Sequence, residues 1–173
     1  MDGLNPVQLV AVVALPLLFA ITLHEVAHGW IARQLGDPTA MMLGRLTVNP
    51  IKHIDPIGTV AVPLLLLLTS GFVFGWARPV PVTWENLKNP KRDMALVAAA
   101  GPGANLVMAM FWALVVKLGL TIGDSFPGYL EPLLLMGQYG IFINLVLMVL
   151  NLLPVPPLDG SRVVTAFLPG PWA

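Results

Sequence analysis

Residues 6–28 read PVQLVAVVALPLLFAITLHEVAH, and this stretch decides what kind of molecule the chain can form. It carries no charged residue until it reaches His24, Glu25 and His28. An uncharged apolar run of about 20 residues is long enough to cross the hydrocarbon core of a bilayer as a helix. We therefore expect a membrane helix over about residues 6–35, with ionisable side chains near one end.

The remainder of the chain is similarly apolar. Of its 173 residues, 57% are hydrophobic and 10% are charged, whereas about a quarter of the residues in an ordinary globular domain are charged. Three further runs contain no Asp, Glu, Lys or Arg, and they cover residues 56–77, 94–116 and 132–158. Two of these runs predict membrane helices, at about residues 94–118 and 133–153.

The segment over about residues 41–82 has a different pattern. Up to residue 59 it interleaves apolar, often β-branched residues with polar ones, which is typical of short strands. Residues 56–77 are apolar but are interrupted by glycine and proline. We predict interfacial strands followed by a re-entrant run. The fold class is then an all-α membrane protein with about three transmembrane helices plus a re-entrant or interfacial segment with short β-strands, in one domain over residues 1–173.

Charge and cysteine content exclude several classes of function. The formal net charge is zero and no basic tract stands out, so nucleic-acid binding has no electrostatic basis. The chain has no cysteine, which excludes disulfides, thiolate metal ligands and cysteine nucleophiles. The partner that the composition does imply is the lipid bilayer.

His24, Glu25 and His28 fit the helical H-E-x-x-H pattern. Histidines at i and i+4 project from one helical face and can hold a single Zn²⁺, so we predict one zinc per chain. Glu25 lies beside the metal, where its carboxylate is suited to take a proton from water that the metal activates. Ionisable groups at membrane depth are costly and are seldom kept without a functional reason.

A catalytic zinc site usually has three protein ligands, so this motif lacks one. His53, Asp55 and Asp159 are the candidates. Asp159 is preferred because it lies in a proline-rich loop, residues 154–162. Irregular backbone is tolerated at membrane depth only where it is buried in protein or lines a wet cavity.

Charge distribution predicts the orientation. If residues 56–77 do not cross the membrane, Lys117 lies on one face and the other eight of the nine Lys and Arg residues lie on the opposite face. Such an excess marks the cytoplasmic side. We predict a multi-pass protein of the plasma membrane, with the His24–His28 motif and Asp159 toward the cytoplasm.

Three motifs occur in an order that is typical of one family. They read HEVAH at 24–28, GPGANL at 101–106 and NLLPVPPLDG at 151–160. In this combination the chain resembles the site-2 protease family of intramembrane zinc metalloproteases, from about residue 15 to residue 165.

The resemblance implies roles for three more residues. Asp159 matches the third zinc ligand of the family, and Asn105 and Asn151 match asparagines that help to bind substrate or stabilise the oxyanion. The implied function is hydrolysis of peptide bonds in or near transmembrane segments of membrane proteins, so the implied partner is a membrane protein with such a segment. The alternative is a non-catalytic zinc-binding membrane protein or transporter, in which Glu25 would have no task.

Overall fold

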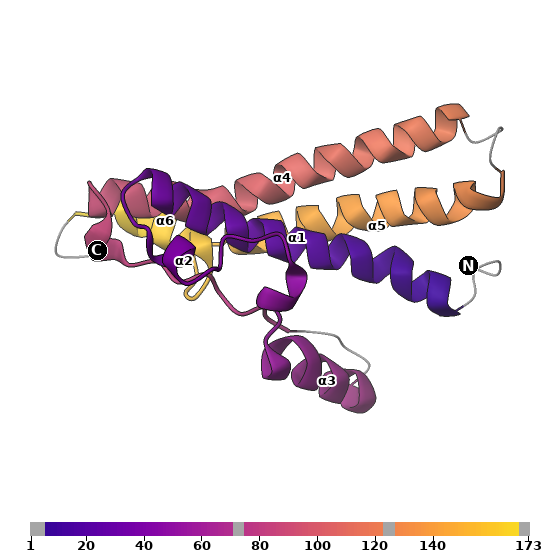
Figure 1. The fold of residues 1–173 in the computed structure, drawn as a ribbon, viewed down its shortest axis with the longest axis horizontal. Coiled ribbons are helices and arrows are strands. Elements are labelled where there is room, and N and C mark those ends of the chain that lie inside the picture. Colours follow the sequence, from indigo (N-terminus) through magenta and orange to yellow (C-terminus); the bar gives the residue numbers. More distant parts are fainter. Residues whose placement is uncertain (1–5, 71–74, 123–126, 170–173) are drawn as a thin grey trace.

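Three long helices form the body of the molecule in this computed structural model, which describes residues 6–70, 75–122 and 127–169 (Figure 1). They are α1 (Pro6–Gln34), α4 (Pro90–Ile122) and α5 (Pro127–Asn151). Each packs against the other two, and each contains a stretch long and apolar enough to cross a membrane. The prediction of an all-α membrane protein with three long apolar helices is confirmed.

Shorter helices occupy the connections and the C-terminal part. They are α2 (Thr39–Met42), η1 (Pro50–Lys52), η2 (Pro56–Ala61), α3 (Val62–Ser70), η3 (Trp84–Asn86) and α6 (Asp159–Phe167). α6 packs on α4, at the end of the bundle that also holds the C-terminal part of α1 and α2 (Figure 1). The C-terminal end of α4 and the N-terminal end of α5 are at the opposite end (Figure 1).

The short β-strands predicted over residues 41–59 are wrong, since no strand is present in the part of the chain that the structure describes. Pro50 and Pro56 instead begin η1 and η2, because proline has no N–H to lose at a first helical position. The residues before them act as caps: Asn49 accepts the N–H of Ile51, and Asp55 accepts two backbone N–H groups at the start of η2. Local capping therefore prevails over the alternating pattern.

The segment that contains η2 and α3 leaves the bundle and returns to the same place. The N–H of Trp76 donates to the carbonyl of Gly58 at 3.0 Å, and the Thr59 hydroxyl donates to the carbonyl of Trp76 at 2.8 Å. A Cβ on Gly58 would lie 2.3 Å from the Trp76 ring, so this close approach requires glycine. We call residues 56–70 together with residues 75 and 76 the α3 hairpin. It stands apart from the long helices (Figure 1), and its joined ends are those that a re-entrant run requires.

Asp37 fastens the end of α1 to the chain that follows the hairpin. Its side chain is fully buried and accepts hydrogen bonds from the N–H and hydroxyl of Thr39, the N–H of Thr83 and the amide of Asn86. Burial alone would raise the pKa of the Asp37 carboxyl, but these hydrogen bonds hold that pKa below its usual range. The carboxylate is thus part of the fold near the end of the bundle.

An apolar core lies beside Asp37, where α1 packs on α4. Ala32, Leu87 and Val97 are buried there, with Leu35 and Trp84 packed around them. Burying such side chains stabilises the folded state by roughly 1.5–3 kcal/mol for each Leu or Val. Val97 also carries the carbonyl that contacts His28, so the core and the polar centre described next share an element.

Candidate metal centre

Three potential ligand atoms converge where α1 meets α6. His24 and His28 lie one turn apart on α1, and Asp159 is the first residue of α6. The two Nε2 atoms are 3.1 Å apart, and each is 3.2 Å from Asp159 Oδ2. The three side chains are buried, at no more than 9% exposure. The structure thus brings Asp159 together with the two histidines.

The hydrogen bonds on the far side of each ring fix which nitrogen carries a proton. His24 Nδ1 is 2.6 Å from Asn105 Oδ1, and His28 Nδ1 is 2.7 Å from the carbonyl oxygen of Val97. Both partner oxygens are acceptors, so each Nδ1 is assigned as the donor, and the Nε2 of a ring that carries a single proton then presents a lone pair. Two lone pairs and a carboxylate oxygen thus face one another, an arrangement that a cation stabilises.

The triangle of donor atoms fits zinc. A tetrahedral Zn²⁺ with bonds of about 2.0–2.1 Å has neighbouring ligand atoms about 3.3 Å apart, close to the sides of 3.1 and 3.2 Å. Asp159 Oδ2 is buried and has no hydrogen-bond partner among the described residues. Two imidazoles and one carboxylate in this geometry could therefore hold a zinc ion.

Gly101 allows α4 to pass close to the two histidines. A Cβ at this position would lie 2.5 Å from His28 Nε2 and 2.6 Å from His24 Cε1. Any larger residue would thus occupy the space in front of the ligand atoms. Gly103, two residues further along α4, has open space beside it. The two glycines of the Gly101-Pro102-Gly103 motif therefore have different tasks.

A chain of buried amides holds His24 in place. Asn105 accepts from His24 and donates to Asn144 Oδ1 at 2.9 Å, and Asn144 donates to the carbonyl of Gly140 at 2.8 Å. Both asparagines are fully buried. Sequence reasoning missed Asn144, although an amide within an apolar helix is itself a signal of interhelical hydrogen bonding. α5 thereby supports a ligand that α1 carries.

Glu25 lies next to the ligands on α1 and is half-buried. Its Oε2 accepts the N–H of Val80 at 2.7 Å. Val80 belongs to the extended chain that returns from the α3 hairpin. The carboxylate is thus held by one oxygen through a contact that joins residues far apart in the sequence.

The other predicted site residues lie in different settings. His53 is buried with Nε2 2.9 Å from the carbonyl oxygen of Thr47, and Asp55 caps η2. Among the described residues, the acidic and histidine groups whose ligand atoms could share a metal are His24, His28 and Asp159. The structure therefore does not bring His53 or Asp55 together with His24 and His28. The Asn151 amide donates to its own helix, at the carbonyl of Leu147, and its predicted role at the substrate stays a prediction.

Three apolar helices around two histidines, an aspartate and an adjacent glutamate define a helical membrane protein with a metalloprotease-like centre. Comparisons with known proteins narrow this class. The chain is 41% identical over 168 residues to "Putative zinc metalloprotease YwhC" of Bacillus subtilis, which covers 95% of this chain and 72% of that protein. The chain belongs to the site-2 protease family of zinc metalloproteases.

Two more distant relatives are also named as zinc metalloproteases. Identity is 34% over 167 residues to "Putative zinc metalloprotease Rip2" of Mycolicibacterium smegmatis, with 92% of this chain and 59% of that protein covered. It is 30% over 147 residues to the Mycobacterium tuberculosis protein of the same name, with 83% and 52% covered. The chain thus spans about half of the Rip2 proteins and a larger share of YwhC. No family model and no solved structure matches it.

Proposed function

We propose that this chain hydrolyses peptide bonds in or near transmembrane segments of other membrane proteins. The observation that carries the proposal is the convergence of His24, His28 and Asp159 beside Glu25, in a bundle whose long helices have the length and composition of membrane spans. Membership of a zinc metalloprotease family supports the chemistry. The apolar helices support a substrate that also resides in the bilayer.

The ligand set assigns a task to each residue. Zinc held by His24, His28 and Asp159 would supply Lewis-acid chemistry, which polarises a carbonyl and lowers the pKa of water. Glu25 takes a proton from the attacking water and passes it to the leaving amine. Since Val80 holds Glu25 Oε2, Oε1 is the oxygen that we assign to this proton transfer.

We assign Asn105 first to positioning His24. Both polar atoms of its side-chain amide have partners in the structure. The oxygen accepts from His24, and the nitrogen donates to the carbonyl of Ala20 and to Asn144. A direct contact between Asn105 and substrate would need these bonds to rearrange. Asn151 is half-buried, and we propose it as the amide that reaches the substrate or the oxyanion, where such a donor lowers the barrier by about 3 kcal/mol.

We propose three crossings, with the metal-bearing end toward the cytoplasm and the bilayer being the plasma membrane. The joined ends of the α3 hairpin support a segment that does not cross. The C-terminal end of α4, the helix that contains Lys117, lies at the opposite end of the bundle from α6 (Figure 1). The excess of basic residues at the metal-bearing end supports a cytoplasmic orientation.

The test is co-expression with a panel of single-span membrane proteins. We expect the native chain to shorten at least one of them, whereas Glu25→Gln abolishes cleavage and retains one zinc per chain by elemental analysis. His28→Ala is expected to lose both. Cleavage that persists in Glu25→Gln would refute the assignment of the base. Zinc binding with no cleavage of any panel member by the native chain would favour a non-catalytic zinc protein or a transporter.

A further inference from the structure

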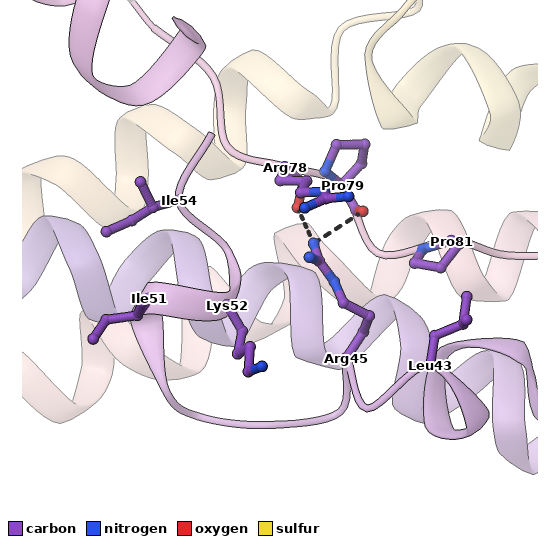
Figure 2. Close-up of a pocket in the computed structure, with 8 residues that line it drawn as sticks. All are labelled: Leu43, Arg45, Ile51, Lys52, Ile54, Arg78, Pro79 and Pro81. Atoms are coloured by element: carbon purple, nitrogen blue, oxygen red, sulfur yellow. Dashed lines mark hydrogen bonds between the residues drawn. The ribbon is translucent and has the colours of Figure 1, made fainter. Parts of the chain in front are cut away.

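A cavity lies between the two segments that flank the α3 hairpin. It has a volume of about 530 Å³ and lies between residues 43–54 and residues 78–81 (Figure 2). This volume is within the range of about 300–1,000 Å³ that is typical of small-molecule sites. We call it the basic pocket, because its charged lining residues are Arg45, Lys52 and Arg78.

The cationic side chains of the basic pocket have no carboxylate partner among the described residues. Within the described part of the chain, no carboxylate forms an ion pair with Arg45, Lys52 or Arg78. Arg45 Nη2 donates to the carbonyls of Arg78 and Pro79, at 2.8 and 3.3 Å (Figure 2). Its Nε is buried without a hydrogen-bond partner among the described residues. The pocket therefore holds donors and positive charge that lack an acceptor.

The two arginines repel each other. Burial and the charge of Arg78 together lower the pKa of Arg45 from its ordinary value, against the opposing effect of Glu25. An anion between Arg45 and Arg78 would relieve this repulsion. A phosphate group matches such a site, because it accepts several charge-assisted hydrogen bonds from guanidinium groups at once.

Apolar side chains share the basic pocket with the cations. Leu43 and Ile51 line it and are 62% and 73% exposed. Ile54 also lines it (Figure 2). A small soluble anion would make no favourable contact with these apolar side chains. A phospholipid carries a phosphate and acyl chains in one molecule and can contact both the cations and the apolar side chains. Basic pockets on the cytoplasmic side of membrane proteins are suited to anionic headgroups.

We propose that the basic pocket binds the phosphate headgroup of an anionic phospholipid in the leaflet at the metal-bearing end. Arg45 and Arg78 hold the phosphate, Lys52 adds charge at the rim, and Leu43 and Ile51 contact the start of the acyl chains. This assignment rests on the membrane orientation given under the proposed function. A peptide substrate fits less well, because the cytoplasmic flanks of transmembrane segments are enriched in Lys and Arg, which the pocket repels.

The pocket is adjacent to the candidate base. Pro79 and Pro81 line it, and Val80 between them donates its N–H to Glu25. A lipid bound in the pocket therefore rests against the segment that holds Glu25. The lipid site is nonetheless independent of zinc, since none of its lining residues is a ligand.

The test measures lipid binding rather than proteolysis. Native mass spectrometry of the full chain, titrated with phosphatidylglycerol or phosphatidylcholine, gives the Kd of the first bound lipid. We expect phosphatidylglycerol to bind about ten-fold more tightly, and each pocket cation removed to weaken it about five-fold, since a Lys or Arg near anionic lipid contributes about 1 kcal/mol. Arg45→Gln with Arg78→Gln is the main variant. Lys52→Gln changes one exposed side chain, so it still tests the pocket if the double variant fails to fold.

The matched control is Arg33→Gln with Lys88→Gln. Both residues are exposed and carry the same charge toward the same end, but neither lines the pocket. Equal affinity for the two lipids, or an equal loss in the control, would overturn the proposal. Complete displacement by inorganic phosphate would also overturn it in favour of a free-phosphate site. Lipid binding is measured on the chain without any substrate protein, so failure of the lipid site and failure of the proposed hydrolysis are distinguishable.

Discussion

The metal centre and the α3 hairpin are built in opposite ways. At the centre, polar side chains from α1, α4, α5 and α6 are buried and bonded to one another across long distances in the sequence. In the hairpin, apolar side chains such as Leu65 and Leu68 are 60% and 76% exposed, and α3 packs chiefly on the adjacent η2. Polar groups away from water must satisfy one another, whereas apolar groups facing lipid need no particular partner. The centre therefore depends on exact residues, and the hairpin depends on its two joined ends.

Gly101→Ala is expected to break the centre while leaving the hairpin intact. The added Cβ would meet His28 Nε2, a ligand atom, and Cε1 of the His24 ring. Loss of a partner of a metal ligand typically lowers metal affinity by about 10–100-fold, and we expect zinc affinity to fall at least this much. Competition with a chelator measures this affinity. Gly103→Ala is the control, since open space surrounds that position. Equal affinities in the two variants would contradict the role assigned to Gly101.

Asn144→Ala should weaken the centre from a distance. Without its Oδ1, Asn105 loses an acceptor and orients His24 less firmly, so we expect zinc affinity to fall by about ten-fold. The pH at which zinc is released should rise, because zinc binds a less well positioned imidazole more weakly and is displaced from it by protons at a higher pH. Asn151→Ala is the comparison: its amide bonds within its own helix, so zinc affinity should stay unchanged. A loss as large in Asn151→Ala would show that the effect is not specific to the amide chain.

Gly58→Ala should disturb the hairpin and spare the metal. The new Cβ would collide with the Trp76 ring, which must move and weaken the contacts that join the hairpin ends. Hydrogen exchange over residues 56–70 is expected to quicken. Zinc affinity should stay within about two-fold, within ordinary surface-substitution effects. If zinc affinity fell as far as in Gly101→Ala, the hairpin and the centre would be one unit rather than two.

Asp37 gives the smallest expected effect, in the dependence of stability on pH. Because the folded protein lowers the pKa of Asp37, its contribution is fully present above the ordinary aspartate pKa of about 3.9. That contribution is lost as the pH falls through the folded pKa. Native protein and Asp37→Asn should differ in Tm at neutral pH and converge below about pH 4. A Tm difference that stays constant across this range would contradict the prediction.

The sequence predicts the centre better than it predicts the connections. The spacing of His24 and His28 fixes their relation on any helix, and charge-free runs locate the three long helices. The assignment of Asp159 as a ligand depended on the family resemblance, because an aspartate in a turn is common and does not by itself indicate a metal site. The strands failed because Pro50 and Pro56, with Asn49 and Asp55 before them, favour helical starts. The bond from Val80 to Glu25 joins residues that no local pattern relates, so it was not predictable.

The ligand set is spread along the chain, from two imidazoles on α1 to a carboxylate on the first residue of α6. During translation, the ribosome has made nearly all of this stretch before the last ligand emerges. A nascent fragment that has already inserted α1 has the base but only part of the metal site. Order of synthesis thus keeps the candidate metal centre incomplete until the surrounding bundle has been made.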